Sequence, residues 1–163
     1  FAQEHDFLIY KDAKDLTNFR DTEEFQKISD TSVDFYWATV IYFKKSEQNK
    51  IFFDLTQHIQ ENWDHYNSIF QVNKGIFRND HVFSIAIHIM NGYQKGDFAH
   101  KLPGIKYYTA DRDILWDLED DNFFFLLEKQ NHLGEYTPLR IKGSSVHVMN
   151  KFSLNRIIDK GEM

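Results

Sequence analysis

Residues 35–46 read FYWATVIYFKKS, and this stretch carries the strongest strand signal in the chain. Val33–Phe43 is dominated by β-branched and aromatic residues, which suit the pleated surface of a sheet. Over Trp37–Phe43 the apolar side chains fall on both faces, a pattern typical of a strand that is covered on each side. The stretch therefore predicts a central strand that ends in a turn at residues 44–47, KKSE.

A long amphipathic helix is predicted directly after this strand. Ser46 is suited to cap it, and Glu47 lies in the first turn, where an acidic group complements the partial positive charge of the free N–H groups. Apolar residues then recur at steps of three or four and form one stripe: Phe52, Leu55, Ile59, Trp63 and Tyr66. The stripe predicts a helix that packs on a sheet.

A second helix is predicted within residues 78–92, RNDHVFSIAIHIMNG. Asn79 is expected to be its N-cap, with Asp80 in the first turn. Gly92 is expected to end the helix, because glycine readily adopts the positive φ of a helix stop. The predicted buried face consists of Val82, Phe83, Ala86, Ile87 and Met90.

The remaining elements are short. Phe7–Tyr10 predicts a strand, and a helical turn is predicted near Glu23–Ile28. Closely spaced strands, typical of antiparallel hairpins, are predicted at Ile105–Thr109, Ile114–Trp116, Phe123–Glu128, Leu139–Lys142 and Val146–Met149, and a closing helix at Ser153–Asp159. We therefore expect an α/β fold in which helices flank a mixed sheet, organised as a single domain over residues 1–163. Because the sequence begins at Phe1 with a strand close behind, we expect it to be a fragment of a longer chain.

The composition narrows the classes of function. The formal charge of −6 argues against sequence-independent binding to nucleic acid or to an anionic membrane, since both rely on an excess of Lys and Arg. The 163 residues include no cysteine, which excludes disulfides, thiolate nucleophiles and cysteine-based zinc sites. The first residues show no secretory signal, so we expect a cytoplasmic protein, in the host cytoplasm if it is viral.

The first candidate site is the sequence Arg78–Asn79–Asp80 at the start of the second predicted helix. A helix N-terminus offers free N–H groups to an anion, and a carboxylate there can face a polar ligand. Ordinary helix capping is the alternative interpretation of these three residues.

Two further candidates lie in the second half of the chain. Asp111 and Asp113, two positions apart after a predicted strand, could bind a divalent cation or could belong to a solvated turn. His147 lies in a predicted strand, and Lys151 follows four residues later. A neutral imidazole is a metal ligand and a lysine can offset the charge of a diphosphate, whereas a structural histidine is the alternative.

The order of these segments resembles the C-terminal part of the GT-A nucleotide-diphospho-sugar transferases, notably the glycogenin and bacterial galactosyltransferase relatives and uncharacterised transferase-like proteins of phages. Ala38 and Val40 match the apolar strand of that family, while Trp37 and Thr39 stand where the family has Asn and Gly. The late segment VHVMNK, residues 146–151, matches the family's histidine-containing strand with its following lysine. The family's nucleotide-binding half would precede residue 1, so the resemblance implies a chain that is catalytically incomplete by itself.

The resemblance also implies roles for individual residues. Asp80 would be the catalytic residue at the donor sugar, with Arg78 and Asn79 beside it. His147 would be a ligand of a divalent ion, most often Mn²⁺, and Lys151 would bind the diphosphate of the nucleotide-sugar donor. The acceptor is not identified by any of these motifs.

Two other hypotheses stay open. One is a non-enzymatic structural or interaction domain of viral origin that associates with a second copy of itself through an open strand edge. The other is a metal-dependent hydrolase built on Asp111, Asp113 and a nearby histidine.

Overall fold

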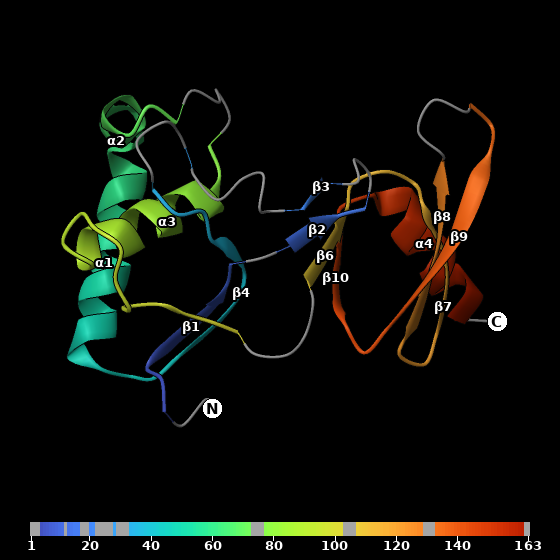
Figure 1. Ribbon diagram of the computed structural model, residues 1–163, viewed down its shortest axis with the longest axis horizontal. Coiled ribbons are helices and arrows are strands. Elements are labelled where there is room, and N and C mark those ends of the chain that lie inside the picture. The colour runs from blue at the N-terminus through green and yellow to red at the C-terminus, as the bar shows by residue number, and fades with distance from the viewer. Residues whose placement is uncertain are drawn as a thin grey trace. The chain divides into compact units, whose positions relative to one another are not determined.

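The computed structural model describes residues 4–11, 13–16, 20–21, 28, 33–72, 77–102, 107–128 and 133–161. These residues form a mixed α/β protein with four helices and three small sheets (Figure 1). The chain divides into two compact units, Phe1–Asp12 with Thr22–Pro103 (unit 1) and Ala13–Asp21 with Gly104–Met163 (unit 2). The single domain expected over residues 1–163 stays a prediction. The helical turn expected near Glu23–Ile28 falls largely outside the described residues.

The sheet of unit 1 has the strand order β4-β1-β5. β1 (Phe7–Tyr10) pairs antiparallel with β4 (Trp37–Phe43) and parallel with β5 (His100–Lys101), so the sheet is mixed as expected. All four residues of β1 are buried, which confirms the strand predicted from residues 7–10 and places it at the centre of the sheet.

The prediction that residues 33–43 form a central strand is wrong, because β4 is an edge strand of this sheet. Val40 and Phe43 are 45% and 46% exposed, although both are apolar. The pairing with β1 is also irregular, since the neighbours Ile9 and Tyr10 face Ile41 and Trp37, which are four residues apart. A run of β-branched and aromatic residues does not distinguish an edge from a centre, because that depends on where the other strands lie.

The helices of unit 1 are α1 (Glu47–Glu61), α2 (Trp63–Ile69) and α3 (Asn79–Met90). The cap predicted at Ser46 is confirmed, since its side chain accepts a hydrogen bond of 3.1 Å from the N–H of Asn49. The single long helix is divided at Asn62, whose side-chain amide donates to the carbonyl of His58 at 2.9 Å. The same carbonyl also accepts the backbone N–H of Asn62 at 3.1 Å, and the apolar stripe continues into the separate short helix α2.

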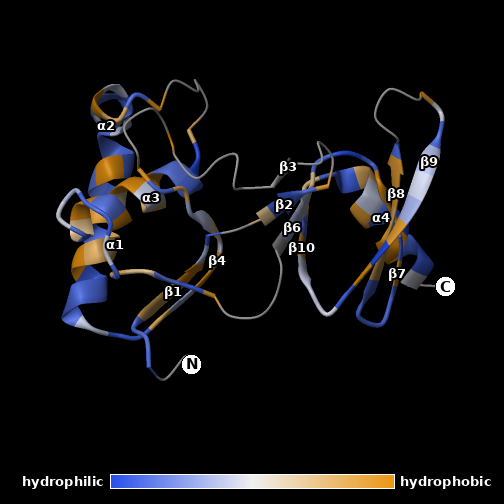
Figure 2. Cartoon of the chain, in the orientation of Figure 1, coloured by the Kyte–Doolittle hydropathy of each residue, from blue (hydrophilic) through white to orange (hydrophobic). Residues whose placement is uncertain are grey.

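The core of unit 1 is built around Phe52, which is fully buried. Its ring lies 4.7 Å from that of Phe7 in β1, 5.1 Å from Phe98 and 5.5 Å from Phe83 in α3, measured between centroids. Polar and apolar bands alternate along α1 in Figure 2, as expected for a helix that buries one stripe. α1 and α3 therefore pack together with β1 around one aromatic centre.

Unit 2 contains a four-stranded sheet of order β10-β6-β2-β3, formed by β2 (Ala13–Asp15), β3 (Arg20–Asp21), β6 (Tyr107–Ala110) and β10 (Ser145–Val148). β6 runs parallel to both β2 and β10, so the antiparallel hairpins predicted for the segments of β6 and β10 are wrong; no strand was predicted at β2. The hairpins are confirmed for β7 (Leu115–Glu119), β8 (Asn122–Glu128) and β9 (Tyr136–Lys142), which form an antiparallel meander. The closing helix is α4 (Lys151–Gly161).

No helix among the described residues combines the length and the apolar character needed to cross a membrane.

Candidate functional site

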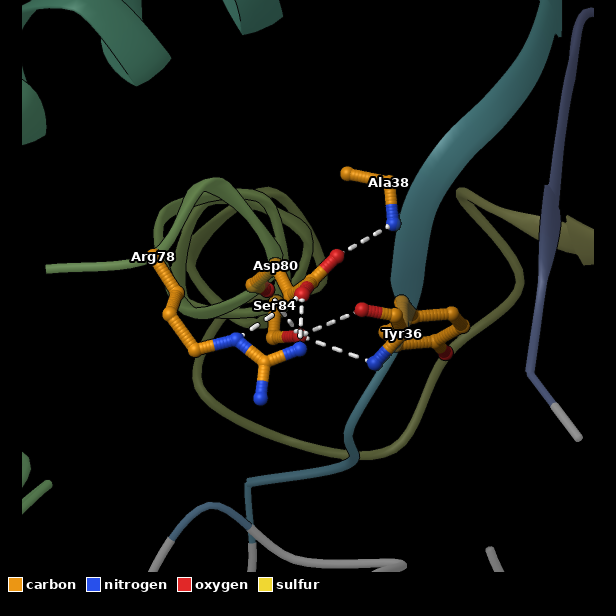
Figure 3. Close-up of polar contacts among 5 residues, drawn as sticks. All are labelled: Tyr36, Ala38, Arg78, Asp80 and Ser84. Atoms are coloured by element: carbon orange, nitrogen blue, oxygen red, sulfur yellow. Dashed lines mark hydrogen bonds and ion pairs between the residues drawn. The ribbon is translucent and has the colours of Figure 1, made fainter. Parts of the chain in front are cut away.

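Asp80 joins α3 to β4. Its Oδ1 accepts a hydrogen bond of 2.9 Å from the backbone N–H of Ala38, across a separation of 42 residues in the sequence (Figure 3). The Asp80 side chain is 14% exposed, so the carboxylate lies mostly inside the surface and yet touches solvent. One of its two oxygens is thus fixed by the edge of the sheet.

Arg78 holds the second oxygen of this carboxylate. Its Nε and Nη2 donate to Asp80 Oδ2 at 3.1 Å and 2.5 Å, a two-point contact that orients both groups. The guanidinium carbon also lies 5.9 Å from the ring centroid of Phe35 and 5.4 Å from that of Trp37. Because the Arg78 side chain is 44% exposed, a charged group remains accessible beside Asp80.

The predicted cap of α3 is wrong by one residue. Arg78 occupies the N-cap position and Asn79 is the first helical residue, and no side chain caps this end. Asp80, the expected first-turn acid, reaches across to β4 and does not accept an N–H of its own helix. Asn79 is exposed, next to the Arg78–Asp80 pair in sequence.

Ser84 belongs to the same group of contacts, and the sequence analysis did not identify it. This side chain is fully buried, and its Oγ accepts the N–H of Tyr36 at 2.8 Å (Figure 3). The available signal was the spacing of four between Asp80 and Ser84, which puts both side chains on one face of the helix. The sequence analysis named only the apolar residues of this helix as its buried face.

Burial raises the pKa of the Tyr36 phenol, an effect that the charge of Lys11 opposes in part. Lys11 forms an ion pair of 2.6 Å with Asp34, and its Nζ lies 5.5 Å from the centroid of the Tyr36 ring. The phenol therefore stays protonated at neutral pH. These side chains extend the polar contacts of β4 beyond the bonds made by α3.

His147 and Lys151, the other predicted site residues, belong to unit 2. His147 lies in β10, where it is in register with Thr109 of β6, and it is partly buried. Lys151 is the exposed first residue of α4. The structure brings Arg78, Asn79 and Asp80 together in unit 1, and it places these two residues near each other at the end of β10 and the start of α4.

Within the described residues, no three His, Asp or Glu side chains are grouped so that they could hold a metal ion. The Mn²⁺ site that the resemblance implies stays a prediction, with His147 as the residue proposed for it.

Asp113, one of the two carboxylates of the hydrolase hypothesis, anchors α4. It accepts the Ser153 hydroxyl at 2.8 Å, and Arg156 Nη2 lies 2.5 Å and 2.6 Å from its two oxygens. The hydrogen bond from Ser153, followed by the contact with Arg156, holds the pKa of Asp113 below its usual value. This carboxylate is thus engaged by a cation and a hydroxyl of α4, an arrangement that favours a structural role. Asp111 is exposed beside it.

Comparison of the chain with models of protein families, with curated proteins and with solved structures gave no match.

Proposed function

We propose that this chain is a glycosyltransferase-like domain that contributes to the transfer of a sugar from a nucleotide-diphospho-sugar donor. The observation that supports this function best is the hydrogen bond between Ala38 and Asp80. These residues come from the two segments of unit 1 on which the resemblance to the GT-A transferases rests. The fold brings the two segments into direct contact, as a shared donor-sugar site requires.

In this proposal Asp80 binds the donor sugar. A carboxylate oxygen has more than one lone pair, so Asp80 can accept a sugar hydroxyl while it keeps its bonds to Ala38 and Arg78. Asn79, exposed next to it, offers an amide to a second hydroxyl. Arg78 supplies an accessible positive charge for the donor.

In unit 2, Lys151 is proposed to have a phosphate-binding role of its own, because an ammonium can offset the charge of a diphosphate. His147 is the residue of the described chain proposed to contact a divalent ion, most often Mn²⁺ in such transferases. That ion, when bound, would supply further positive charge to the diphosphate. We place this activity in the cytoplasm, with an acceptor whose chemistry the site does not define.

Calorimetric titration with a panel of nucleotide sugars, with and without Mn²⁺, tests the proposal. We expect the wild-type chain to bind at least one donor, and Asp80→Asn and His147→Ala to weaken that binding. Asp54→Asn is the matched control for the loss of charge, because Asp54 is exposed on α1. A donor affinity that Asp80→Asn leaves unchanged would remove Asp80 from the site, and no binding of any donor would contradict the function.

A second function is favoured by the exposed apolar residues of the edge strand. Val40, Tyr42 and Phe43 of β4 are 45%, 38% and 46% exposed, which suits pairing with a second copy of the chain. Asp80 and Ser84 occupy the N–H groups of Ala38 and Tyr36, so such pairing is limited to the second half of β4. Light scattering at high concentration distinguishes the two outcomes: a strict monomer excludes this function, and a dimer that Val40→Lys dissociates supports it.

A further inference from the structure

We propose that Ser84 is the positioning residue of the Asp80 site. It fixes the first turn of α3 against β4, and the Asp80 carboxylate is thereby held at the N–H of Ala38. The inference about geometry stands on unit 1 alone. Its consequence for a donor sugar rests on the proposed function.

Two hydrogen bonds join α3 to the segment Tyr36–Ala38, and we refer to this pair of bonds as the ladder. Ser84 accepts the N–H of Tyr36 at 2.8 Å, and Asp80 accepts the N–H of Ala38 at 2.9 Å. These two N–H groups, one in β4 and one just before it, are two residues apart and both point toward α3, as Figure 3 shows. On the helix, the two acceptors are four residues apart and lie on one face.

The roles of the Ser84 hydroxyl are fixed by distance. Its Oγ lies 2.6 Å from the carbonyl oxygen of Asp80 and 3.5 Å from that of Tyr36, so the hydroxyl proton is donated to Asp80. The oxygen is then left to accept the N–H of Tyr36. Ser84 thus binds the backbone of Asp80 and the backbone of Tyr36, the residue directly before β4, at the same time.

Because Ser84 is buried, removing its hydroxyl is expected to cost stability. Ser84 is 0% exposed, so water cannot readily replace its hydroxyl when it is removed. Asp80, by contrast, retains access to solvent and to Arg78. The buried bond between Ser84 and Tyr36 therefore sets the position of the helix. The partly buried bond between Asp80 and Ala38 holds the carboxylate that a ligand would meet.

Amide hydrogen exchange measured by NMR tests this role through Ala38, which Ser84 does not touch through any hydrogen bond of the ladder. Ser84→Ala removes the acceptor of Tyr36 directly. If Ser84 positions Asp80, the same substitution lowers the exchange protection of Ala38 as well, by about tenfold, the factor that one hydrogen bond is typically worth. A role confined to the local bond would change Tyr36 and leave Ala38 as it is.

Ser153→Ala is the matched control, because Ser153 is also fully buried and also donates to an aspartate, Asp113 at 2.8 Å. It is expected to leave the protection of Ala38 unchanged. If Ser84→Ala does not fold, Ser84→Cys replaces it, since a thiol of similar size is a weak acceptor and predicts the same change in the same direction.

Wild-type protection of Ala38 in the Ser84 variant that folds would overturn the inference. Donor binding is measured in parallel and separates the two claims. If the wild-type chain binds no nucleotide sugar while Ala38 loses its protection, the proposed function fails and the positioning role stands. If donor binds and Ser84→Ala weakens its affinity along with the protection of Ala38, both are supported.

Discussion

The contacts of Asp80 and Arg78 predict that replacing either residue by alanine lowers the free energy of unfolding by a different amount. Asp80→Ala leaves the partly buried N–H of Ala38 without its acceptor, which costs about 1–3 kcal/mol. It also breaks the ion pair with Arg78, but that pair is worth at most about 1 kcal/mol because the Arg78 side chain is 44% exposed. We therefore expect Asp80→Ala to lower the free energy of unfolding by about 1–4 kcal/mol.

Arg78→Ala is the informative comparison. It removes the same ion pair and the contacts of the guanidinium with the rings of Phe35 and Trp37, which lie 5.9 Å and 5.4 Å away. Together these are expected to cost about 1 kcal/mol at a half-exposed site. The N–H of Ala38 keeps its acceptor in this variant, so the larger penalty is avoided.

Urea unfolding of the wild type, both single variants and the double variant measures these costs. The order Asp80→Ala above Arg78→Ala supports the bond to Ala38 as the main contribution. Asp80→Asn should lie between them, because its side-chain oxygen can still accept the N–H of Ala38. An equal or larger loss of stability for Arg78→Ala would refute the reasoning.

Three further predictions concern the fold. Phe52→Ala should lower the free energy of unfolding by about 3–5 kcal/mol, because this fully buried ring packs against four others; calorimetry that finds under 1 kcal/mol would contradict the described core. Ser46→Ala should cost about 1 kcal/mol through loss of the α1 cap, measured by urea unfolding against Ser68→Ala. Asp113 has a lowered pKa in the folded state, so the stability it contributes is present above its unfolded pKa of about 3.9 and is lost as the pH falls. Acid unfolding followed between pH 6 and pH 2 should therefore depend less steeply on pH in Asp113→Asn; an unchanged profile would exclude this contribution.

Local patterns predicted the elements of this fold better than their arrangement. The buried run Phe7–Tyr10, the cap at Ser46 and the strands after Ile114 all appear in the structure, because hydrophobic spacing and capping chemistry act over a few residues. The order of strands depends on contacts between distant segments. That is why the apolar run of β4 was placed at the centre of its sheet, although it lies at the edge.

In the candidate site, too, the residues of one local segment could be predicted and their distant partners could not. The residues Arg78, Asn79 and Asp80 could be selected from the sequence as polar groups at a helix start. The partner of Asp80 could not, because Ala38 acts through its backbone N–H, which any residue but proline would supply. Ser84 was missed because its role depends on complete burial against Tyr36, and a serine in an amphipathic helix does not reveal its burial.

The sequence pattern also did not predict that β6 pairs in parallel with β10 and β2. Short strands at close intervals favour hairpins, yet Val146 pairs with Tyr108 and Lys14 pairs with the same residue from the other side. These partners are separated by tens of residues, and no turn signal connects them. The antiparallel meander β7-β8-β9 and the short pair β2-β3 follow the rule that neighbours in sequence pair in space.

The most direct test of the proposed donor site is NMR of the isotopically labelled chain with a nucleotide sugar and Mg²⁺, compared with the corresponding nucleoside diphosphate alone. The two ligands differ in the sugar and in the additional negative charge of the free terminal phosphate. Our account predicts that the nucleotide sugar, and not the diphosphate, shifts the amide signal of Ala38, because a hydroxyl bound to Asp80 changes the hydrogen bond that Ala38 donates. Identical spectra with the two ligands, or no shift with either, would contradict the assignment of Asp80 to the donor sugar.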